Sequence, residues 1–231
     1  MVQNNFLSEY TTDLESGCKI LYGSHAASGY LLRIAAEFSV ERPVHLLDFG
    51  NRCDMYYVAR QLRFLTRDPA AAMANIRLQR AFTCYQAAAL MRQMLCIEEG
   101  VPVIILDLLA PFLDENIKTA EINRLFHELV GMIFSIMEKN VVLIGVKPIP
   151  QKLAPDRFCL LNGLVRNFGV IAVPGQQLPA EHGSENCPSA YQMRPALRVF
   201  ETAWSSDISR RVAPQLTSAQ PALFDLDADN P

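Results

Sequence analysis

The stretch Val101-Pro102-Val103-Ile104-Ile105-Leu106-Asp107-Leu108-Leu109 decides the fold class that the sequence predicts. It is short, rich in β-branched residues and apolar at successive positions, so a strand formed here would be buried on both faces. Strands of this kind occur in parallel sheets that helices cover on both sides. The stretch therefore predicts a central strand of an α/β sheet over Val101–Leu109.

Similar apolar runs and helical patterns alternate on both sides of this stretch. Further strands are predicted at Lys19–Tyr22, Val44–Phe49, Val141–Val146, Phe168–Val173 and Leu197–Ala203. Helices are predicted at Gly29–Phe38, Met55–Arg67 and Gln86–Glu99, and over the 3.6-residue apolar period from Ile122 to Met137. This alternation predicts an α/β fold of three layers, α/β/α, with a mostly parallel central sheet.

The composition is that of one folded domain with appendages. The chain has 231 residues, of which 50% are hydrophobic. That content can fill a core, and the length suits one domain at roughly 100–200 residues per domain. We expect an N-terminal lead at 1–14, a core domain at 15–212 with a long loop at 174–195, and a flexible C-terminal tail at 213–231.

Charge and cysteine usage exclude several classes of protein. A net charge of −3 excludes a uniformly basic nucleic-acid binder, although a local basic patch remains compatible with it. The six cysteines lie far apart without metal-binding spacing, which favours reduced thiols and no metal site. The sequence shows no signal peptide and no apolar run of membrane-spanning length. We expect a cytoplasmic protein without a membrane partner.

A first candidate site is Gly23-Ser24-His25-Ala26-Ala27-Ser28-Gly29-Tyr30-Leu31, which follows a predicted strand and opens a helix. This is the position of a phosphate-binding P-loop, which needs a Lys for the phosphates and a Ser or Thr hydroxyl for Mg²⁺. Gly29-Tyr30-Leu31 stands where that Gly-Lys-Ser/Thr triplet would be. A vestigial nucleotide site would comprise Gly23, Ser24, Ser28, Gly29, Tyr30 and Leu31; an ordinary turn of small residues is the alternative.

A second candidate is Asp107, at the end of the apolar strand. In NTPases an aspartate at this place helps to position Mg²⁺. The alternative interpretation is an aspartate that hydrogen-bonds at a strand end.

The stretch Asn75-Ile76-Arg77-Leu78-Gln79-Arg80-Ala81-Phe82-Thr83-Cys84-Tyr85-Gln86 carries a family resemblance. It resembles the Asn-Ile … Arg-Ala-Phe-Asn … His-Gln stretch of the RecA/RadA recombinase superfamily, one residue shorter between Phe82 and Gln86. The order of elements over about residues 15–205 is also similar: a degenerate P-loop, a strand ending Asp48-Phe49-Gly50, this stretch, the Asp107 strand and a strand ending Val146-Lys147. The resemblance implies a RecA-like ATPase core.

The same resemblance implies which catalytic groups are missing. The family's water-activating glutamate has no counterpart, because Phe49 or Gly50 occupies its place, and the family's sensor glutamine appears as Lys147. Asp107 alone remains of the hydrolytic set. We therefore expect no ATP hydrolysis and no cofactor, and leave ATP binding without hydrolysis as an open alternative.

Arginines concentrate between residues 51 and 92, where seven stand against two aspartates, a local charge of +5. Arg60, Arg63 and Arg67 have the spacing of one helix face, and Arg77 and Arg80 follow. These five are candidates for DNA contact; a solvated helix face is the alternative. The resemblance places DNA-holding loops near Asp114–Glu121 and Pro148–Arg157, which adds Lys147, Lys152 and Arg157 as candidates.

The C-terminal tail contains Gln220-Pro221-Ala222-Leu223-Phe224. This pentapeptide is similar to the Gln-x-x-Leu-Phe peptide by which bacterial replication and repair proteins dock to the sliding clamp. Gln220, Leu223 and Phe224 are then candidates for partner binding. The alternatives are a chance match and a Leu-Phe pair that packs on the protein's own domain.

Together these observations predict a non-hydrolysing RecA/RadA-like paralogue, an accessory protein of DNA recombination or repair. The expected partners are proteins, either a second copy or a RecA-like paralogue, together with single-stranded DNA and, through the tail, a sliding clamp. One alternative is a RecA-fold structural subunit of a ring or heteromeric complex. Another is a regulator that senses ATP without hydrolysing it.

Overall fold

The structure is a computed structural model of the 231-residue chain, and it describes residues 17–149, 155–168 and 170–172. The strand predicted at 197–203, the loop at 174–195, the lead at 1–14 and the tail at 213–231 lie outside these residues.

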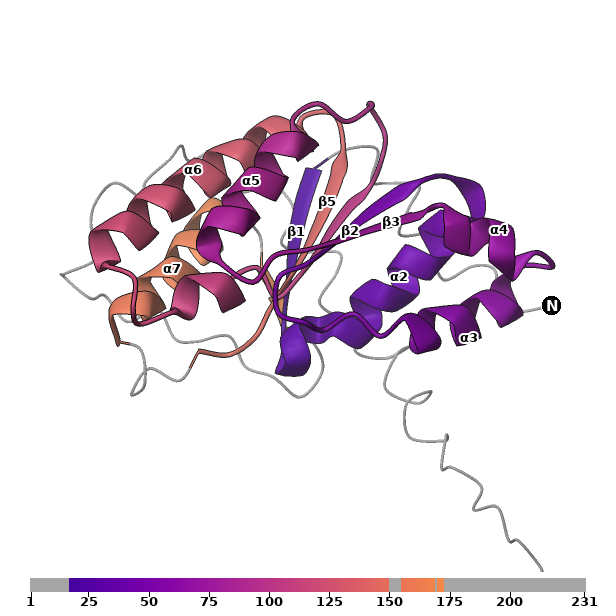
Figure 1. Cartoon of the computed structure of the whole chain (residues 1–231), viewed down its shortest axis with the longest axis horizontal. Coiled ribbons are helices and arrows are strands. Elements are labelled where there is room, and N and C mark those ends of the chain that lie inside the picture. Colours follow the sequence, from indigo (N-terminus) through magenta and orange to yellow (C-terminus); the bar gives the residue numbers. More distant parts are fainter. Residues whose placement is uncertain (1–16, 150–154, 169, 173–231) are drawn as a thin grey trace, which may run out of the picture. The chain divides into compact units, whose positions relative to one another are not determined.

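A six-stranded sheet forms the centre of the described part of the chain (Figure 1). Its strands are β1 (Gly17–Tyr22), β2 (Val44–Asp48), β3 (Ile76–Arg80), β4 (Val103–Leu106), β5 (Val141–Val146) and β6 (Val170–Ala172). They lie in the order β3-β2-β4-β5-β1-β6, and every pair of neighbours is parallel. The carboxyl ends of all six strands therefore meet at one edge of the sheet.

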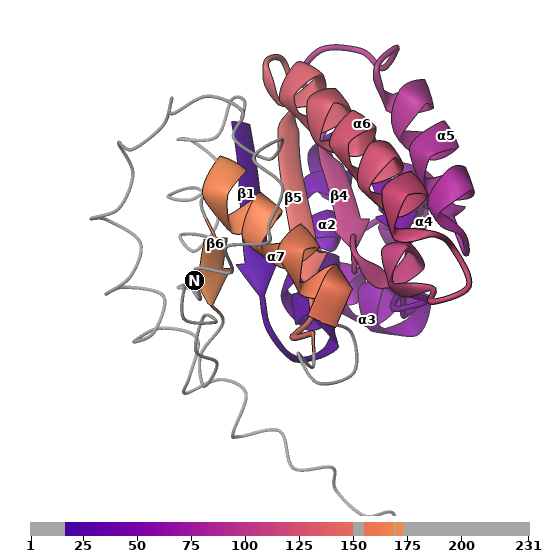
Figure 2. The ribbon, with the colours of Figure 1, turned by 90° about the vertical axis from the view of Figure 1, so that its left-hand side faces the viewer.

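Helices cover both faces of this sheet (Figures 1 and 2). One layer consists of α2 (Ser28–Glu41), α3 (Met55–Leu65) and α4 (Pro69–Ala74), and the other of α5 (Cys84–Met94), α6 (Thr119–Met137) and α7 (Pro155–Asn167). Two separate apolar clusters, one for each layer, fill the space between helices and sheet. The three-layer α/β/α fold predicted from the sequence is confirmed.

Burial explains why the central strand has its sequence. All four residues of β4 are buried, because Val103 and Ile105 pack into the α5–α6–α7 layer while Ile104 and Leu106 pack into the other. Burying one such side chain contributes about 1.5–3 kcal/mol, so the run is a strong determinant of the fold. Within the described residues, no helix is both long and apolar enough to cross a lipid bilayer.

Side-chain caps fix where several helices begin. The Asp54 carboxylate accepts hydrogen bonds from the backbone N–H groups of Tyr56 and Tyr57, and thereby starts α3. Asp68 caps α4, and Thr83 caps α5. A cap of this type contributes about 1 kcal/mol. The cap fixes where α3 begins, and the burial of Val58 and Leu62 decides which of its side chains point outward.

Three elements, which are β3, α4 and α7, were not predicted from the sequence. β3 has the polar sequence Ile-Arg-Leu-Gln-Arg and forms one edge of the sheet, where only one side is paired, so it lacks the apolar run of a central strand. The beginning of α7 falls in the segment expected to be a DNA-holding loop, Pro148–Arg157. The central strand is also shorter than predicted, because the backbone turns at Asp107, whose φ of 57° is left-handed.

Candidate functional site at the carboxyl edge of the sheet

The turn after β1 packs closely against the neighbouring strand β5 of the sheet. It consists of a 3₁₀ segment, Ser24–Ala27, in which His25, Ala26 and Ala27 all have left-handed backbone angles, with φ of 52°, 57° and 52°. This conformation costs roughly 1–2 kcal/mol for each residue with a side chain, and it persists only where the surroundings impose it. Here the surroundings are β5, because the Gly23 N–H donates to the Val146 carbonyl at 3.0 Å.

Close packing on Gly145 completes this arrangement. A Cβ atom at Gly145 would overlap the carbonyl oxygen of Ala26 and would come within 2.7 Å of Leu31 Cδ1. Ala26 and Ala27 are buried, whereas Ser24 and His25 are exposed. The absence of a side chain at Gly145, next to the carboxyl end of β5, is therefore what lets the turn approach the sheet.

The last two residues of the Gly29-Tyr30-Leu31 triplet are packed into the protein. Leu31 is fully buried in the core between α2 and the sheet, and Gly29 is exposed. Tyr30 is half-buried next to Tyr57 of α3, and its burial, together with that neighbour, raises the pKa of the Tyr30 hydroxyl. Neither Tyr30 nor Leu31 offers the charge or the metal-binding hydroxyl of a P-loop.

Two aspartates lie at the ends of the adjacent strands β2 and β4. Asp48, the last residue of β2, is buried and accepts hydrogen bonds from the backbone N–H groups of Arg52, at 2.8 Å, and Cys53, at 3.1 Å. Its Oδ2 atom also lies 3.2 Å from Nε of Arg80, which comes from the end of β3. The first carboxylate is therefore neutralised and held by groups of the chain itself.

Asp107 is fully buried and contacts two cations. Its Oδ2 atom lies 3.4 Å from Nζ of Lys147, which follows β5, and 3.5 Å from Nε of Arg52. Among the described residues, neither oxygen of Asp107 accepts a hydrogen bond. Both cationic side chains are about one-third exposed, at 30% for Lys147 and 32% for Arg52. Two partly exposed cations of the same chain, Arg52 and Lys147, thus balance the charge of the buried carboxylate.

These aspartates mark a reversal in the order of the strands. The chain leaves β2 toward β3 on one side and leaves β4 toward β5 on the other, and in open α/β sheets ligands bind in the crevice at such a point. In this protein the loop after β2 packs directly against Asp107, so closely that a Cβ atom at Gly50 would overlap the aspartate side chain. Backbone and arginine thus lie over the place where a ligand would approach Asp107.

The electrostatics of the edge follow from this packing. A divalent cation at Asp107 would have to displace Arg52 and Lys147, the two cations that already contact the carboxylate. Among the described residues, no group of three or more His, Cys, Asp or Glu side chains is arranged to hold a metal ion. Burial and the neighbouring Asp48 raise the pKa of Cys53 to about 11, so this thiol stays protonated and unreactive.

The structure places the DNA candidates in different environments. Arg60, Arg63, Arg67 and Arg77 are exposed, whereas Arg80 and Lys147 contact the buried aspartates of the edge. Lys152 lies outside the described residues, as do Gln220, Leu223 and Phe224 of the tail. The seven basic candidates that the structure describes therefore do not form one surface.

Arg157 differs most from its expected position. It is buried on α7, and its guanidinium donates to the carbonyls of Asp114 and Ile117 and to the Thr119 hydroxyl, at 2.7–3.2 Å. These bonds fix the segment before α6, which is the other segment expected to hold DNA. The guanidinium therefore has a structural role here, and the segment it ties down is anchored at three points.

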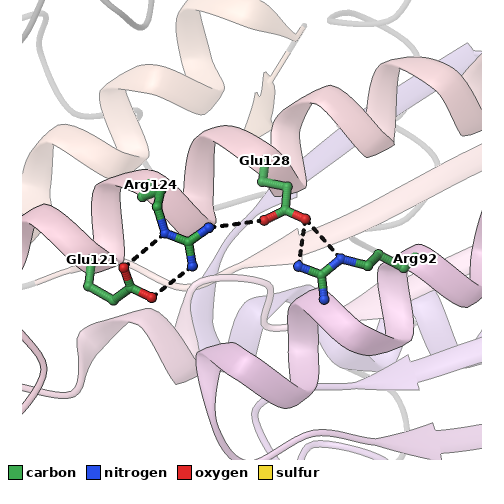
Figure 3. A network of polar contacts seen from close by, with 4 residues as sticks. All are labelled: Arg92, Glu121, Arg124 and Glu128. Carbon is green, nitrogen blue, oxygen red and sulfur yellow. Dashed lines mark hydrogen bonds and ion pairs between the residues drawn. The ribbon is translucent and has the colours of Figure 1, made fainter.

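Arg92, which also belongs to the arginine-rich segment, is paired across two helices (Figure 3). It contacts Glu128 of α6, which contacts Arg124, which in turn contacts Glu121. Hydrogen bonds from Arg124 lower the pKa of the Glu121 carboxyl. The network joins α5 to α6 on the exposed side of their layer.

Sequence reasoning missed two kinds of residue. Arg52 was counted only as charge, although it contacts Asp107, and the exposed aromatics Tyr56 and Phe64 of α3 were not singled out. The signal for the aromatics was the inward positions Val58 and Leu62, which direct residues 56 and 64 outward. No model of a known protein family matches this chain, and no curated protein is significantly similar to it in sequence.

Proposed function

We propose that the protein is a non-hydrolysing RecA-like accessory protein of DNA recombination or repair, which acts by binding its partners. The observation that carries the proposal is the state of Asp107, a fully buried carboxylate with Arg52 and Lys147 as its partners. In an NTPase the aspartate at this place helps to position Mg²⁺. In this protein its partners are two side chains of the chain itself.

The neighbouring turn supports the same proposal. Phosphoryl transfer is catalysed almost entirely by positioning and by charges that stabilise the transition state. Tyr30 and Leu31 supply no such charge, and the Ser24–Ala27 turn is pressed onto Gly145 of β5. What remains of the proposed ATPase core is a scaffold, whose exposed surfaces are then the functional parts.

The test is a nucleotide assay on the full chain. Phosphate release from ATP with Mg²⁺ is expected to stay at the background rate, in the wild-type protein and in Asp107→Asn alike. Nucleotide affinity measured by calorimetry is expected to be the same with Mg²⁺ and with a chelator. Turnover that Asp107→Asn abolishes would refute the proposal, as would a nucleotide affinity that rises with Mg²⁺.

The alternatives give different results in the same experiments. A regulator that senses ATP would bind nucleotide without Mg²⁺ and without turnover. A structural subunit would form a defined oligomer in sedimentation and would bind neither nucleotide nor DNA. The accessory role predicts DNA binding that weakens as salt concentration rises, because phosphate contacts release counterions.

A further inference from the structure

The outward side of α3 carries an unusual set of side chains. Val58 and Leu62 are fully buried, which leaves Tyr56 91% exposed and Phe64 82% exposed. Arg60 and Arg63 lie between these aromatics in sequence and are exposed too, as is Arg67, two residues beyond the helix. We call Tyr56, Arg60, Arg63, Phe64 and Arg67 the α3 surface. Exposed apolar groups that gather on one face and are rimmed by polar residues mark interaction sites, whereas single exposed apolar residues do not.

The charges of the α3 surface are available to a ligand. Among the described residues, Arg60, Arg63 and Arg67 make no ion pair; Arg60 lies over the ring of Tyr57 at 5.7 Å. The nearby Asp54 carboxylate is engaged as the cap of α3. The surface therefore presents three guanidinium groups to solvent with no acidic residue within α3 itself.

The first turns of α3 also border a hollow. Its volume is about 310 Å³, and it is lined by Asp54, Tyr56, Tyr57, Ala59, Arg60 and Arg63. Two aromatic rings and two guanidinium groups thus surround one open space. A flat, polar ring system such as a nucleobase suits a site of this composition, because it can stack on an aromatic face or on a guanidinium plane.

The pattern favours nucleic acid over a protein helix as the ligand. An amphipathic helix that docks in a groove needs a continuous apolar strip. On α3 the apolar positions Val58 and Leu62 are already buried in the core, and the exposed aromatics are separated by arginines. Proteins that bind single strands without sequence preference combine this same pair of features, stacking aromatics and cations along the backbone.

We propose that the α3 surface binds single-stranded nucleic acid, with bases stacked on Tyr56 and Phe64 and phosphates held by Arg60, Arg63 and Arg67. Phe64 stands eight positions after Tyr56, which is about 12 Å along a helix, so successive contacts follow the helix axis. This deepens the proposed function, on which it rests, by giving the DNA contact a location. That location is distinct from the segments near 114–121 and 148–157, the first of which Arg157 anchors.

The experiment measures the fluorescence anisotropy of labelled oligo(dT), oligo(rU) and a duplex DNA hairpin with the full chain at low salt. We expect the single strands to bind more tightly than the duplex, and the DNA and RNA arms to show which backbone is preferred. Tyr56→Ala and Phe64→Ala should each weaken single-strand binding about tenfold. Arg60→Gln with Arg63→Gln should weaken it and lower the slope of log affinity against log salt by about 1–2.

Matched variants separate stacking from apolar contact and from unfolding. Tyr56→Phe keeps a ring and should bind like the wild type, whereas Tyr56→Leu should not. Phe82→Ala removes another exposed aromatic, outside the α3 surface, and should leave binding unchanged. Because Tyr56 and Phe64 are so exposed, their alanine variants should unfold in urea with the wild-type midpoint.

Two outcomes would overturn the inference. One is a wild-type protein that binds no strand, as expected if the α3 surface serves an acidic protein instead. The other is binding that Tyr56→Ala and Phe64→Ala leave unchanged. The second outcome overturns only the location on α3 and leaves the proposed accessory role intact. The first also counts against the DNA binding of that role, and neither bears on the absence of nucleotide turnover.

Discussion

The carboxyl edge of the sheet and the α3 surface both contain arginines, but the two regions use them differently. At the edge, Arg52 and Arg80 contact Asp107 and Asp48, two buried carboxylates that end neighbouring strands. On the α3 surface, Arg60 and Arg63 face solvent without an ion pair among the described residues, next to exposed aromatic rings. The charged groups at the carboxyl edge are thus paired within the chain, whereas the arginines of the α3 surface are accessible to a ligand.

This difference separates a structural use of charge from a binding use. A buried carboxylate left without a partner is strongly destabilising, so cations that contact Asp48 and Asp107 are required by the fold itself. A guanidinium in water has no such constraint and keeps its donors for phosphate or carboxylate ligands. Substitutions at the edge should therefore change stability, whereas substitutions on α3 should change binding.

The largest expected effect is on the packing that closes the edge. Gly145→Ala places a methyl group against the Ala26 carbonyl, a backbone atom that can move only if the strained Ser24–Ala27 turn moves as well. We expect the free energy of unfolding, measured in urea, to fall by about 3 kcal/mol. Gly131→Ala in α6 is the control: nothing lies within 4 Å of the added Cβ, and it should gain up to about 1 kcal/mol. Equal effects of the two substitutions would show that the turn does not press on β5.

The next largest effect should come from the charge at Asp107. Asp107→Ala leaves Arg52 and Lys147 without their shared carboxylate and puts alanine at a φ of 57°. Removing one partner of a buried pair costs about 3–5 kcal/mol; since both cations are one-third exposed, we expect a loss of about 2 kcal/mol. Asp107→Asn keeps the shape and tolerates the left-handed backbone, so it should lose less. If alanine and asparagine prove as stable as aspartate, the ion pairs do not hold this edge.

The sequence was sufficient where a local pattern decides the structure. The apolar run Val101–Leu109 predicted a central strand, because burial on both faces leaves a continuous apolar signature. The run did not predict that the strand ends at Leu106, where the backbone turns at the left-handed Asp107.

The spacing of Arg60, Arg63 and Arg67 predicted one shared helix face. This prediction is confirmed for Arg60 and Arg63. It is wrong for Arg67, because α3 ends at Leu65 and the backbone is extended at Thr66.

What the sequence could not provide depends on contacts between distant segments. Lys147 reaches Asp107 because β5 lies next to β4, and that order is a property of the whole sheet. The burial of Arg157 is similar: its charge suggested an exposed DNA contact, but carbonyls of residues 114 and 117 bind its guanidinium. No local pattern distinguishes an arginine that binds phosphate from one that satisfies backbone carbonyls.

The smallest expected effect tests whether exposure or pairing makes the α3 arginines different. Arg92 and Arg124 on the opposite layer are paired although 51% and 58% of their side chains are exposed, and Glu128 contacts both (Figure 3). Glu128→Gln should lower the free energy of unfolding by about 0.5 kcal/mol at low salt and by less at high salt, because exposed ion pairs are weak and screened. Glu99→Gln, at an exposed site with no ion pair among the described residues, is the control and should have no effect. Equal losses of unfolding free energy in the two variants would mean that pairing on this surface contributes nothing to stability. Exposed arginines in both layers would then be equally available to a ligand.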